Sequence, residues 1–233
     1  MANRERLLSL YELFPFHRHP LWTAVLGHHL SSAQVIQAEV QHYLRTRAGQ
    51  SLRREALERA QAISPVIWEA LLDTYLEECT DTVTPSHLDL IKRLLVIGGV
   101  PAEQLEKAQP TVGNAAAIAL YRDISGRGAG CHLLGAGAVE HYYSELAPKI
   151  FKAYTEHYGM SAEQAETYRL HGPMDRTHAN RAFSILEEAV ALHGWPTIEA
   201  SVRDAFLATS LHYDGMLQAA LGRVIFWDGR QSG

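Results

Sequence analysis

Two histidines and an aspartate are spaced along one segment so that a helix would bring them together. His171, Asp175 and His178 stand at positions i, i+4 and i+7. At about 100° of rotation per residue, the second and third side chains point about +40° and about −20° away from the first. Neutral imidazole and carboxylate are ligands that suit iron, and also manganese or zinc. The spacing therefore predicts part of a metal site on one helical face.

The Gly172-Pro173 pair inside this segment leaves the direction of His171 open. A proline within a helix removes a backbone hydrogen bond and disfavours helical geometry at the residue before it. Either the helix bends here or a new helix begins at Pro173. The directions of Asp175 and His178 are therefore better defined than that of His171.

Glu140 follows the small, apolar stretch Leu133–Val139, where glycine and alanine permit close approach of a neighbouring helix or a ligand. A carboxylate in such a setting is costly to bury unless a partner neutralises it. The alternative is a glutamate on the solvent edge of an amphipathic helix. The sequence around Glu140 does not decide between the two.

Glu77 and Glu78 end one predicted helix, and His87 begins the next. Acidic residues at a helix C-terminus oppose the helix dipole, and a cation nearby would offset this. A charged imidazole would also be disfavoured in the first turn of a helix, so a neutral, ligating His87 fits better.

Together these candidates supply three carboxylates and three histidines from separate helices. The predicted ligand set is Glu78, His87, Glu140, His171, Asp175 and His178. Six such ligands can hold two iron ions and leave positions open for dioxygen. The paired Glu-x-x-His motifs of ferritin-like bundles do not occur in the sequence, so the arrangement would differ from theirs. The prediction depends on the combination, because each residue alone is typical of a structural or surface side chain.

Almost every segment that positions these residues is predicted to be helical, and no run of alternating β-branched residues indicates a strand. Helices are expected over 4–13, from 20 onward, and over 31–47, 51–63, 64–79, 87–97, 110–125, 131–158, 161–193 and 195–222. No linker is long enough to separate two domains. We therefore expect one all-α domain over residues 1–233, with a loose tail at 223–233.

Composition and charge exclude several classes of function. The net charge is −5 without a basic run, so we expect no nucleic-acid partner. No apolar run approaches the ~20 residues that span a bilayer, and no apolar region follows the N-terminal residues, so we expect neither a membrane segment nor a signal peptide. Two cysteines, Cys79 and Cys131, are too few for a disulfide framework, which favours a cytoplasmic location.

At this point the residues resemble those of the haem-oxygenase-like diiron oxidases and oxygenases, in the wider group that includes thiaminase II and pyrroloquinoline-quinone synthase. The motifs that carry the resemblance are spread over nearly the whole chain. They are His19-Pro20-Leu21-Trp22, Leu30-Ser31-Ser32-Ala33-Gln34, Leu76-Glu77-Glu78 followed by His87-Leu88, Glu140 eighteen residues before Tyr158-Gly159, and His171-x-x-x-Asp175-x-x-His178. The last motif is the most specific of them.

The resemblance implies a haem-oxygenase-like bundle of about seven to eight helices with the same six residues as iron ligands. The match is ambiguous by one residue between Glu77 and Glu78, and the register of Leu71-Leu72 favours Glu78. It further implies two Fe(II)/Fe(III) ions, with a mixture of iron and manganese left open, and dioxygen as co-substrate. The substrate would be a small molecule such as an amino-acid derivative or a fatty-acid-like compound, and the protein a homodimer.

The expected pocket walls are Trp22, Tyr43, the segment 135–139 and the last helix. The remaining histidines are interpreted as structural: His17, His28, His29, His42, His132, His141, His157, His193 and His212.

Two other functions stay open. The first is a cofactorless oxidase or thiaminase-type enzyme on the same fold, in which acidic and histidine residues transfer protons. Thiaminase II depends on a cysteine nucleophile in a pocket lined by tyrosine and acid, and Cys131 lacks that sequence context. The second is a non-enzymatic metal-binding protein.

Overall fold

The computed structural model describes residues 2–82 and 84–229, and over these residues the chain is helical and contains no strand. This confirms the all-α prediction. The described residues form eleven α-helices and two short 3-10 helices, more than the seven to eight expected. In chain order they are α1 Ala2–Ser9, η1 Leu10–Leu13, η2 Phe16–Arg18, α2 Pro20–Leu26, α3 Ser32–Gln61, α4 Pro65–Cys79, α5 His87–Ile97, α6 Ala102–Lys107, α7 Val112–Arg127, α8 Ala129–His157, α9 Glu166–Ser184, α10 Leu186–His193 and α11 Trp195–Leu221.

Most of the additional helices are short pieces of connecting segments. The helix predicted over 161–193 begins only at Glu166 and is divided at Ile185 into α9 and α10, and α6 forms in a stretch with no predicted helix. The opposite happens in α3, where the two helices predicted over 31–47 and 51–63 are one continuous helix. Gly49 lies within it, at a local cost of about 1 kcal/mol that the contacts of a 30-residue helix offset.

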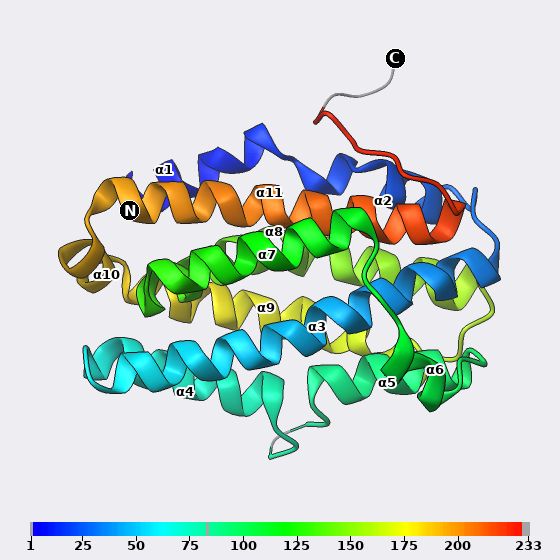
Figure 1. The fold of residues 1–233 in the computed structure, drawn as a ribbon, viewed down its shortest axis with the longest axis horizontal. Coiled ribbons are helices and arrows are strands. Elements are labelled where there is room, and N and C mark those ends of the chain that lie inside the picture. The colour runs from blue at the N-terminus through cyan, green and yellow to red at the C-terminus, as the bar shows by residue number, and fades with distance from the viewer. Residues whose placement is uncertain (1, 83, 230–233) are drawn as a thin grey trace.

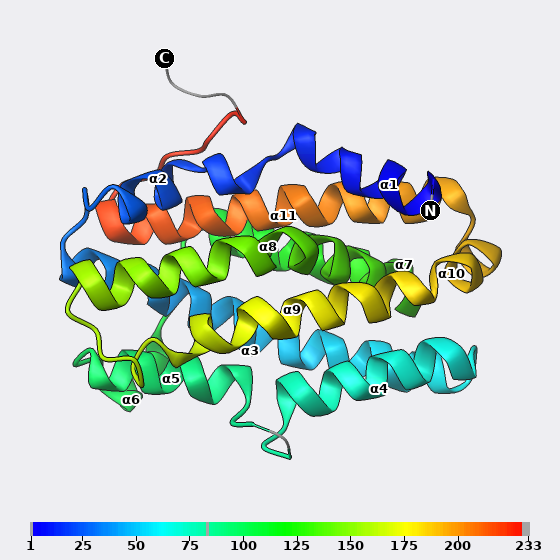
Figure 2. The same ribbon diagram turned by 180° about the vertical axis from the view of Figure 1, so that it is seen from behind.

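The long helices run roughly parallel to the long axis of the molecule (Figure 1). Helix α8 packs most extensively against α9 and also contacts α11, while α11 packs against α7 and α3. Figure 2 shows α9 beside α8 on the opposite side of the molecule from α7. Helices α4 and α5 follow one another in a single row beneath α3 (Figure 1). The C-terminus of α4 and the N-terminus of α5 therefore face the same region, where they meet α9.

Small residues set how closely α8 approaches its neighbours, as the glycine- and alanine-rich stretch indicated. A Cβ atom built on Gly137 would lie 2.2 Å from the Cβ of Ala182 in α9, and one built on Gly135 would lie 3.2 Å from the Cβ of Ala205 in α11. Side chains at these positions would force the helices apart. The glycines thus bring α9, and the residues it carries, against α8.

The last described segment returns along α11. Gly222 ends that helix in a left-handed conformation with φ of 66°. Beyond it, Gln218 Nε2 donates to the Ile225 carbonyl at 2.8 Å, and Trp227 N donates to Asp214 Oδ1 at 2.8 Å. Residues 230–233 of the expected tail lie outside the described residues. Among the described residues, no helix has the length and apolar character needed to cross a bilayer.

Candidate metal centre

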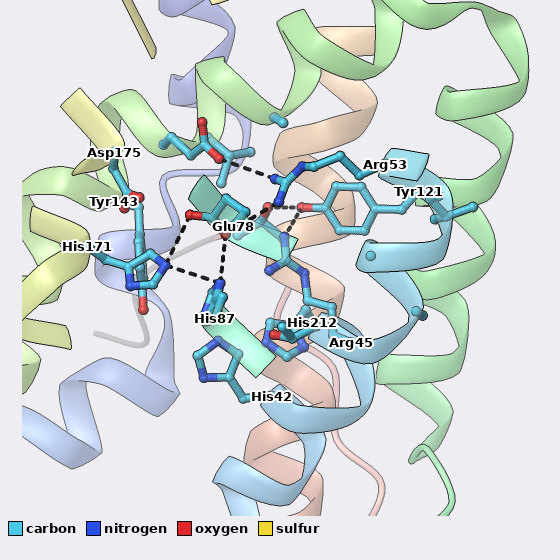
Figure 3. A pocket seen from close by; sticks show the side chains of 18 of the residues that line it. His42, Arg45, Arg53, Glu78, His87, Tyr121, Tyr143, His171, Asp175 and His212 are labelled. Carbon is cyan, nitrogen blue, oxygen red and sulfur yellow. Dashed lines mark hydrogen bonds and ion pairs between the residues drawn. The ribbon is translucent and has the colours of Figure 1, made fainter. Parts of the chain in front are cut away.

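The side chain of Glu78 lies at the centre of the predicted ligand cluster. It stands near the C-terminus of α4 and is 4% exposed. His87 Nδ1 donates to its Oε2 at 3.1 Å, while His171 Nε2 and His178 Nδ1 lie 3.5 and 3.6 Å from its Oε1 (Figure 3 shows Glu78, His87 and His171). Oε2 of Glu78 thus faces one imidazole, and Oε1 faces two.

Two groups of potential metal ligands share Glu78. The first contains His87 and His171, the second Asp175 and His178, and within each group the ligand atoms lie within 4.8 Å of one another. Because a carboxylate has two oxygens, one glutamate can contact two ions at once. The structure therefore brings five of the six predicted ligands together, in two adjoining groups that could each hold a metal ion.

Helix α9 places its three predicted ligands on one buried face. His171, Asp175 and His178 are 5%, 1% and 1% exposed. The helix continues through Pro173 without dividing, so His171 points to the same side as the other two. Gly172 lies against Pro148 of α8, where an added Cβ would be 3.0 Å from the proline ring. This close contact with α8 stabilises the helix where its own backbone hydrogen bonding is weakest.

The outward nitrogens of two histidines are held by hydrogen bonds. His171 Nδ1 donates to the Thr167 carbonyl at 2.6 Å, and His178 Nε2 donates to Glu77 Oε2 at 2.8 Å. These contacts leave His171 Nε2 and His178 Nδ1 directed at Glu78. A carboxylate or carbonyl on the far nitrogen is how metal-ligating histidines are usually oriented.

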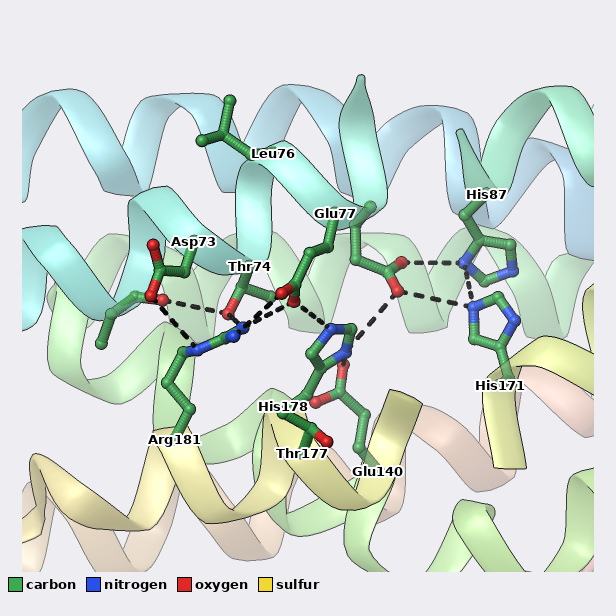
Figure 4. A network of polar contacts seen from close by, with 12 residues as sticks. Asp73, Thr74, Leu76, Glu77, His87, Glu140, His171, Thr177, His178 and Arg181 are labelled. Carbon is green, nitrogen blue, oxygen red and sulfur yellow. Dashed lines mark hydrogen bonds and ion pairs between the residues drawn. The ribbon is translucent and has the colours of Figure 1, made fainter. Parts of the chain in front are cut away.

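Glu77 and Glu78 have different environments, although they are adjacent in sequence. Glu78 points into the cluster, whereas Glu77 accepts two hydrogen bonds from Arg181, at 2.7 and 3.0 Å, besides the one from His178 (Figure 4). The side chain of Glu77 is also 27% exposed. Glu77 is therefore placed to orient His178, and Glu78 is the glutamate that belongs to the potential ligand groups.

Two buried atoms of the cluster lack any hydrogen-bond partner among the described residues: Asp175 Oδ2 and His178 Nδ1. Leaving a buried polar atom unpaired costs about 1–3 kcal/mol, and native proteins rarely tolerate it without a reason. His87 Nδ1 and His171 Nε2 lie 3.1 Å apart. Two nitrogens bound at right angles to one ion, each at about 2.1 Å, would be about 3 Å apart. The residues present therefore fit divalent cations.

Glu140, the sixth predicted ligand, borders the second group without belonging to it. Its Oε1 lies 3.9 Å from His178 Nδ1 and 3.7 Å from Arg53 Nη2. Arg53 also donates to Glu78 Oε2 at 3.4 Å. The guanidinium therefore lies between the two carboxylates and balances part of their charge.

Burial and the charges of neighbouring side chains shift the pKa values of four groups in the cluster. Burial alone would raise the pKa of Glu78, but His171 and His87 hold it well below the usual range. Burial opposes a charge on His171, but Glu78 outweighs it and raises the pKa of His171 to about 9. Burial and the neighbouring charge of His171 lower the pKa of His87 to about 3. Burial raises the pKa of Asp175 well above its ordinary value, and the charges of Glu140 and Glu78 add to the rise.

A cavity of about 130 Å³ opens beside the cluster (Figure 3). Its walls include Trp22, Val139 and, from the last helix, Tyr213 and Met216, in line with the expected walls. Tyr43 does not line it and instead packs beneath the guanidinium of Arg47, 5.5 Å from its ring centroid. His42, His132 and His212, interpreted as structural from the sequence, also line the cavity.

Helix α3 contributes site residues that the sequence analysis did not single out. Glu39 is fully buried and accepts hydrogen bonds from Tyr154, Tyr168 and His42. The ring centroid of His42 lies 5.4 Å from that of His87. A signal for these residues exists in the heptad-like spacing of positions 35, 39, 42, 46, 49, 53 and 56, which places four polar side chains on the same helix face as Val35 and Ala56. Dividing α3 into two helices interrupted this stripe.

The sequence matches the profile of a family described as "iron-containing redox enzyme" over residues 57–214. Solved structures give further matches. A CADD-like protein of unknown function from Nostoc punctiforme is 17% identical, with a TM-score of 0.73 over 96% of this chain and 98% of that one. A domain of unknown function with a haem-oxygenase-like fold from Shewanella denitrificans is 14% identical, with a TM-score of 0.75 over 92% and 90%.

A protein from a Silicibacter species, described as a TenA family transcription regulator, is 11% identical, with a TM-score of 0.68 over 94% and 95% of the two chains. No curated protein matches significantly. At these identities the structural matches establish the fold alone, which is the haem-oxygenase-like fold. The family match and the shared fold together confirm the resemblance identified from the sequence motifs.

Proposed function

The chain belongs to the family of iron-containing redox enzymes, and on that basis we propose that it is a non-haem diiron oxidase or oxygenase, which uses dioxygen to oxidise a small organic substrate. The observation that carries the proposal is the sharing of Glu78 between two ligand groups. A single-ion site needs only one of these groups. The second would then leave Asp175 Oδ2 and His178 Nδ1 buried without a hydrogen-bond partner.

The ligand roles follow from the contacts of each residue. We assign His87 and His171 to one ion, His178 and Asp175 to the other, and Glu78 to both. Glu140 lies close enough to His178 to complete the second ion's ligands after a small movement away from Arg53. Bound iron would supply the redox chemistry with dioxygen, which no protein side chain provides.

The surrounding residues position and insulate this centre. Glu77 and the Thr167 carbonyl hold two of the imidazoles in the orientation that binding requires. Arg53 compensates charge on Glu78 and Glu140. The aromatic and apolar walls of the cavity, such as Trp22 and Val139, exclude water from the place where a substrate would react.

The two cysteines lack the properties that a thiaminase-type reaction needs. Cys131 is fully buried, and burial raises the pKa of its thiol. Burial also raises the pKa of Cys79, whose sulfur faces Arg53 at 3.9 Å. A nucleophilic cysteine needs the opposite, an accessible thiol with a depressed pKa. Neither residue lines the cavity.

Iron stoichiometry tests the proposal. The full chain, loaded with Fe(II) without oxygen and freed of excess metal, should retain two iron ions, and Glu78→Ala should retain fewer than one. Glu69→Ala, which removes an exposed carboxylate of the same helix as Glu78, is the matched control and should retain two. Oxygen uptake by the loaded protein should then exceed that of the Glu78 variant. A natively helical protein that binds one iron or none would contradict a diiron centre.

A further inference from the structure

Arg45 presents a guanidinium to the cavity without a carboxylate partner. It lies in α3, where Nη2 donates to Tyr121 Oη at 2.9 Å and the guanidinium carbon stands 4.7 Å from the centroid of the Tyr121 ring. Its Nε is buried and has no hydrogen-bond partner among the described residues. Tyr121 therefore fixes the orientation of the guanidinium but leaves its positive charge uncompensated.

The other arginines with comparable burial are paired differently. Arg53, Arg93, Arg127 and Arg181 each form an ion pair with at least one carboxylate. A charge removed from water is costly unless an opposite charge or several hydrogen bonds compensate it. Arg4 and Arg45 depart from this pattern among the described residues. Arg4 donates to Asn180 and packs on the Phe183 ring outside the cavity, whereas Arg45 lines the cavity without touching a proposed metal ligand.

The position of Arg45 on α3 places it between two points of contact with the metal centre. His42, three residues earlier, packs near His87, and Arg53, eight residues later, contacts Glu78. All of them line the same cavity, and Figure 3 shows the side chains of Arg45 and His87 on its walls. A molecule held by Arg45 would therefore lie beside the proposed ions.

The net charge of the iron-loaded site favours an anionic occupant beside Arg45. Two divalent ions and the guanidiniums of Arg45 and Arg53 would face the carboxylates of Glu78, Glu140 and Asp175 and the buried Glu39 beside His42, which leaves an excess of two positive charges. An anionic substrate reduces this excess, and a cationic substrate would increase it. Much of the remaining wall is apolar or aromatic, including Trp22, Ile118 and Met216.

We propose that Arg45 binds the carboxylate of the substrate, so that the substrate is a compact carboxylic acid with an apolar or aromatic body. A planar guanidinium forms paired hydrogen bonds with a carboxylate, and the unpartnered Nε is one of the donors that such pairing uses. A cavity of about 150 Å³ accommodates benzene, so one of about 130 Å³ admits a body of similar size. The inference rests on the proposed function for the reaction, but the binding it describes can be measured without turnover.

Calorimetric titration of the full chain with benzoate and with its neutral analogue benzamide tests the proposal, on protein loaded with Fe(II) without oxygen and again on metal-free protein. We expect benzoate to bind at least about tenfold more tightly than benzamide in both forms. Arg45→Met should weaken benzoate about tenfold to 100-fold and leave benzamide unchanged, and Arg45→Lys should restore part of the loss. Arg47→Met is the matched control, because Arg47 is an exposed arginine on the same helix outside the cavity.

Equal affinities for benzoate and benzamide in the wild-type protein would overturn the proposal, and this comparison needs no variant to fold. Benzoate binding that requires iron and is insensitive to Arg45→Met would overturn it too, because the metal would then be the anchor. The iron stoichiometry separates the two proposals. Two ions without selective acid binding would refute the anchor alone, and acid binding by a chain that holds fewer than two ions would refute the diiron centre alone.

Discussion

His178 and Glu77 are joined by a hydrogen bond of 2.8 Å between Nε2 and Oε2, which turns the other imidazole nitrogen toward Glu78. The two adjacent glutamates of α4 thus face opposite nitrogens of one imidazole, Glu77 at Nε2 and Glu78 at Nδ1. Glu77 is itself held by Arg181, so the orientation of His178 depends on a chain of contacts that reaches the surface. This relationship makes the effects of the two glutamates experimentally distinguishable.

Glu77→Gln should preserve the centre, and Glu78→Gln should not. The amide at position 77 can still accept a hydrogen bond from His178 but lacks the charge, so we expect the ion held by His178 to bind with about tenfold to 100-fold lower affinity. Replacing Glu78 removes a ligand that both groups share, so neither ion should bind measurably. Fe(II) titration with a competing chelator measures both variants. Loss of both ions in Glu77→Gln with full retention in Glu78→Gln would reverse the assignment.

Asp175→Asn should stabilise the metal-free protein and weaken its response to iron. Burial raises the pKa of Asp175 well above its ordinary value, so its ionised form is unfavourable in the folded state, and a neutral amide avoids this cost. We expect metal-free Asp175→Asn to gain about 1 kcal/mol in free energy of unfolding at neutral pH. Fe(II) should raise the melting temperature of the variant by less than that of the wild type, because Asp175 is assigned to only one of the two ions. A variant that is less stable than the wild type without metal, and whose melting temperature rises equally with Fe(II), would contradict the role of Asp175 as a ligand.

The parts of the site that lie on one regular helix were predictable, because a helix converts sequence spacing into direction. His171, Asp175 and His178 are the clearest case, and the structure places all three on one buried face of α9. The continuity of that helix across Pro173 was not predictable. Local rules disfavour it, and the compensating contact between Gly172 and Pro148 joins two helices that the sequence does not align.

The contribution of α3 was missed for a related reason. The sequence analysis ended one helix at residue 47 and began the next at 51, and this break hid the single stripe on which Glu39, His42 and Arg53 lie. Whether a polar residue on such a stripe is buried and paired depends on which helices pack against it. For Glu39 the partners are Tyr154 in α8 and Tyr168 in α9, more than 100 residues away in sequence. No local pattern contains that information.

Metal affinity should increase with pH up to about 9. Glu78 raises the pKa of His171 to about 9, so below this value an ion must displace a proton from the imidazole. The pKa of His87 is lowered to about 3, so His87 should not add to the effect. We expect the affinity for Mn(II), used because it stays soluble at alkaline pH, to rise roughly tenfold per pH unit for each displaced proton. A metal affinity that does not change between pH 6 and 8 would show that the ion displaces no proton from His171.

The same imidazole should make the metal-free protein lose stability as pH rises. A histidine whose folded pKa lies above its unfolded value of about 6.5 stabilises the fold fully below that unfolded value, and the contribution disappears as pH rises through the folded pKa of about 9. Urea unfolding of the metal-free chain at pH 6 and pH 9 measures the loss. His171→Gln should reduce the difference between the two conditions. An unchanged difference would assign the effect to other groups.

Gly137→Ala should destabilise the fold and weaken iron binding together, because it separates the helices that carry the ligands. A Cβ at this position would lie 2.2 Å from the Cβ of Ala182, so α8 and α9 would have to move apart, at a cost of about 1–3 kcal/mol. Gly126→Ala is the control, since Gly126 lies in α7 with nothing within 4 Å of an added Cβ. It should stabilise the protein by about 0.5–1 kcal/mol. Chemical denaturation and Fe(II) titration of both variants check the prediction, and a stabilised Gly137→Ala with undiminished iron affinity would refute the close approach of α8 and α9.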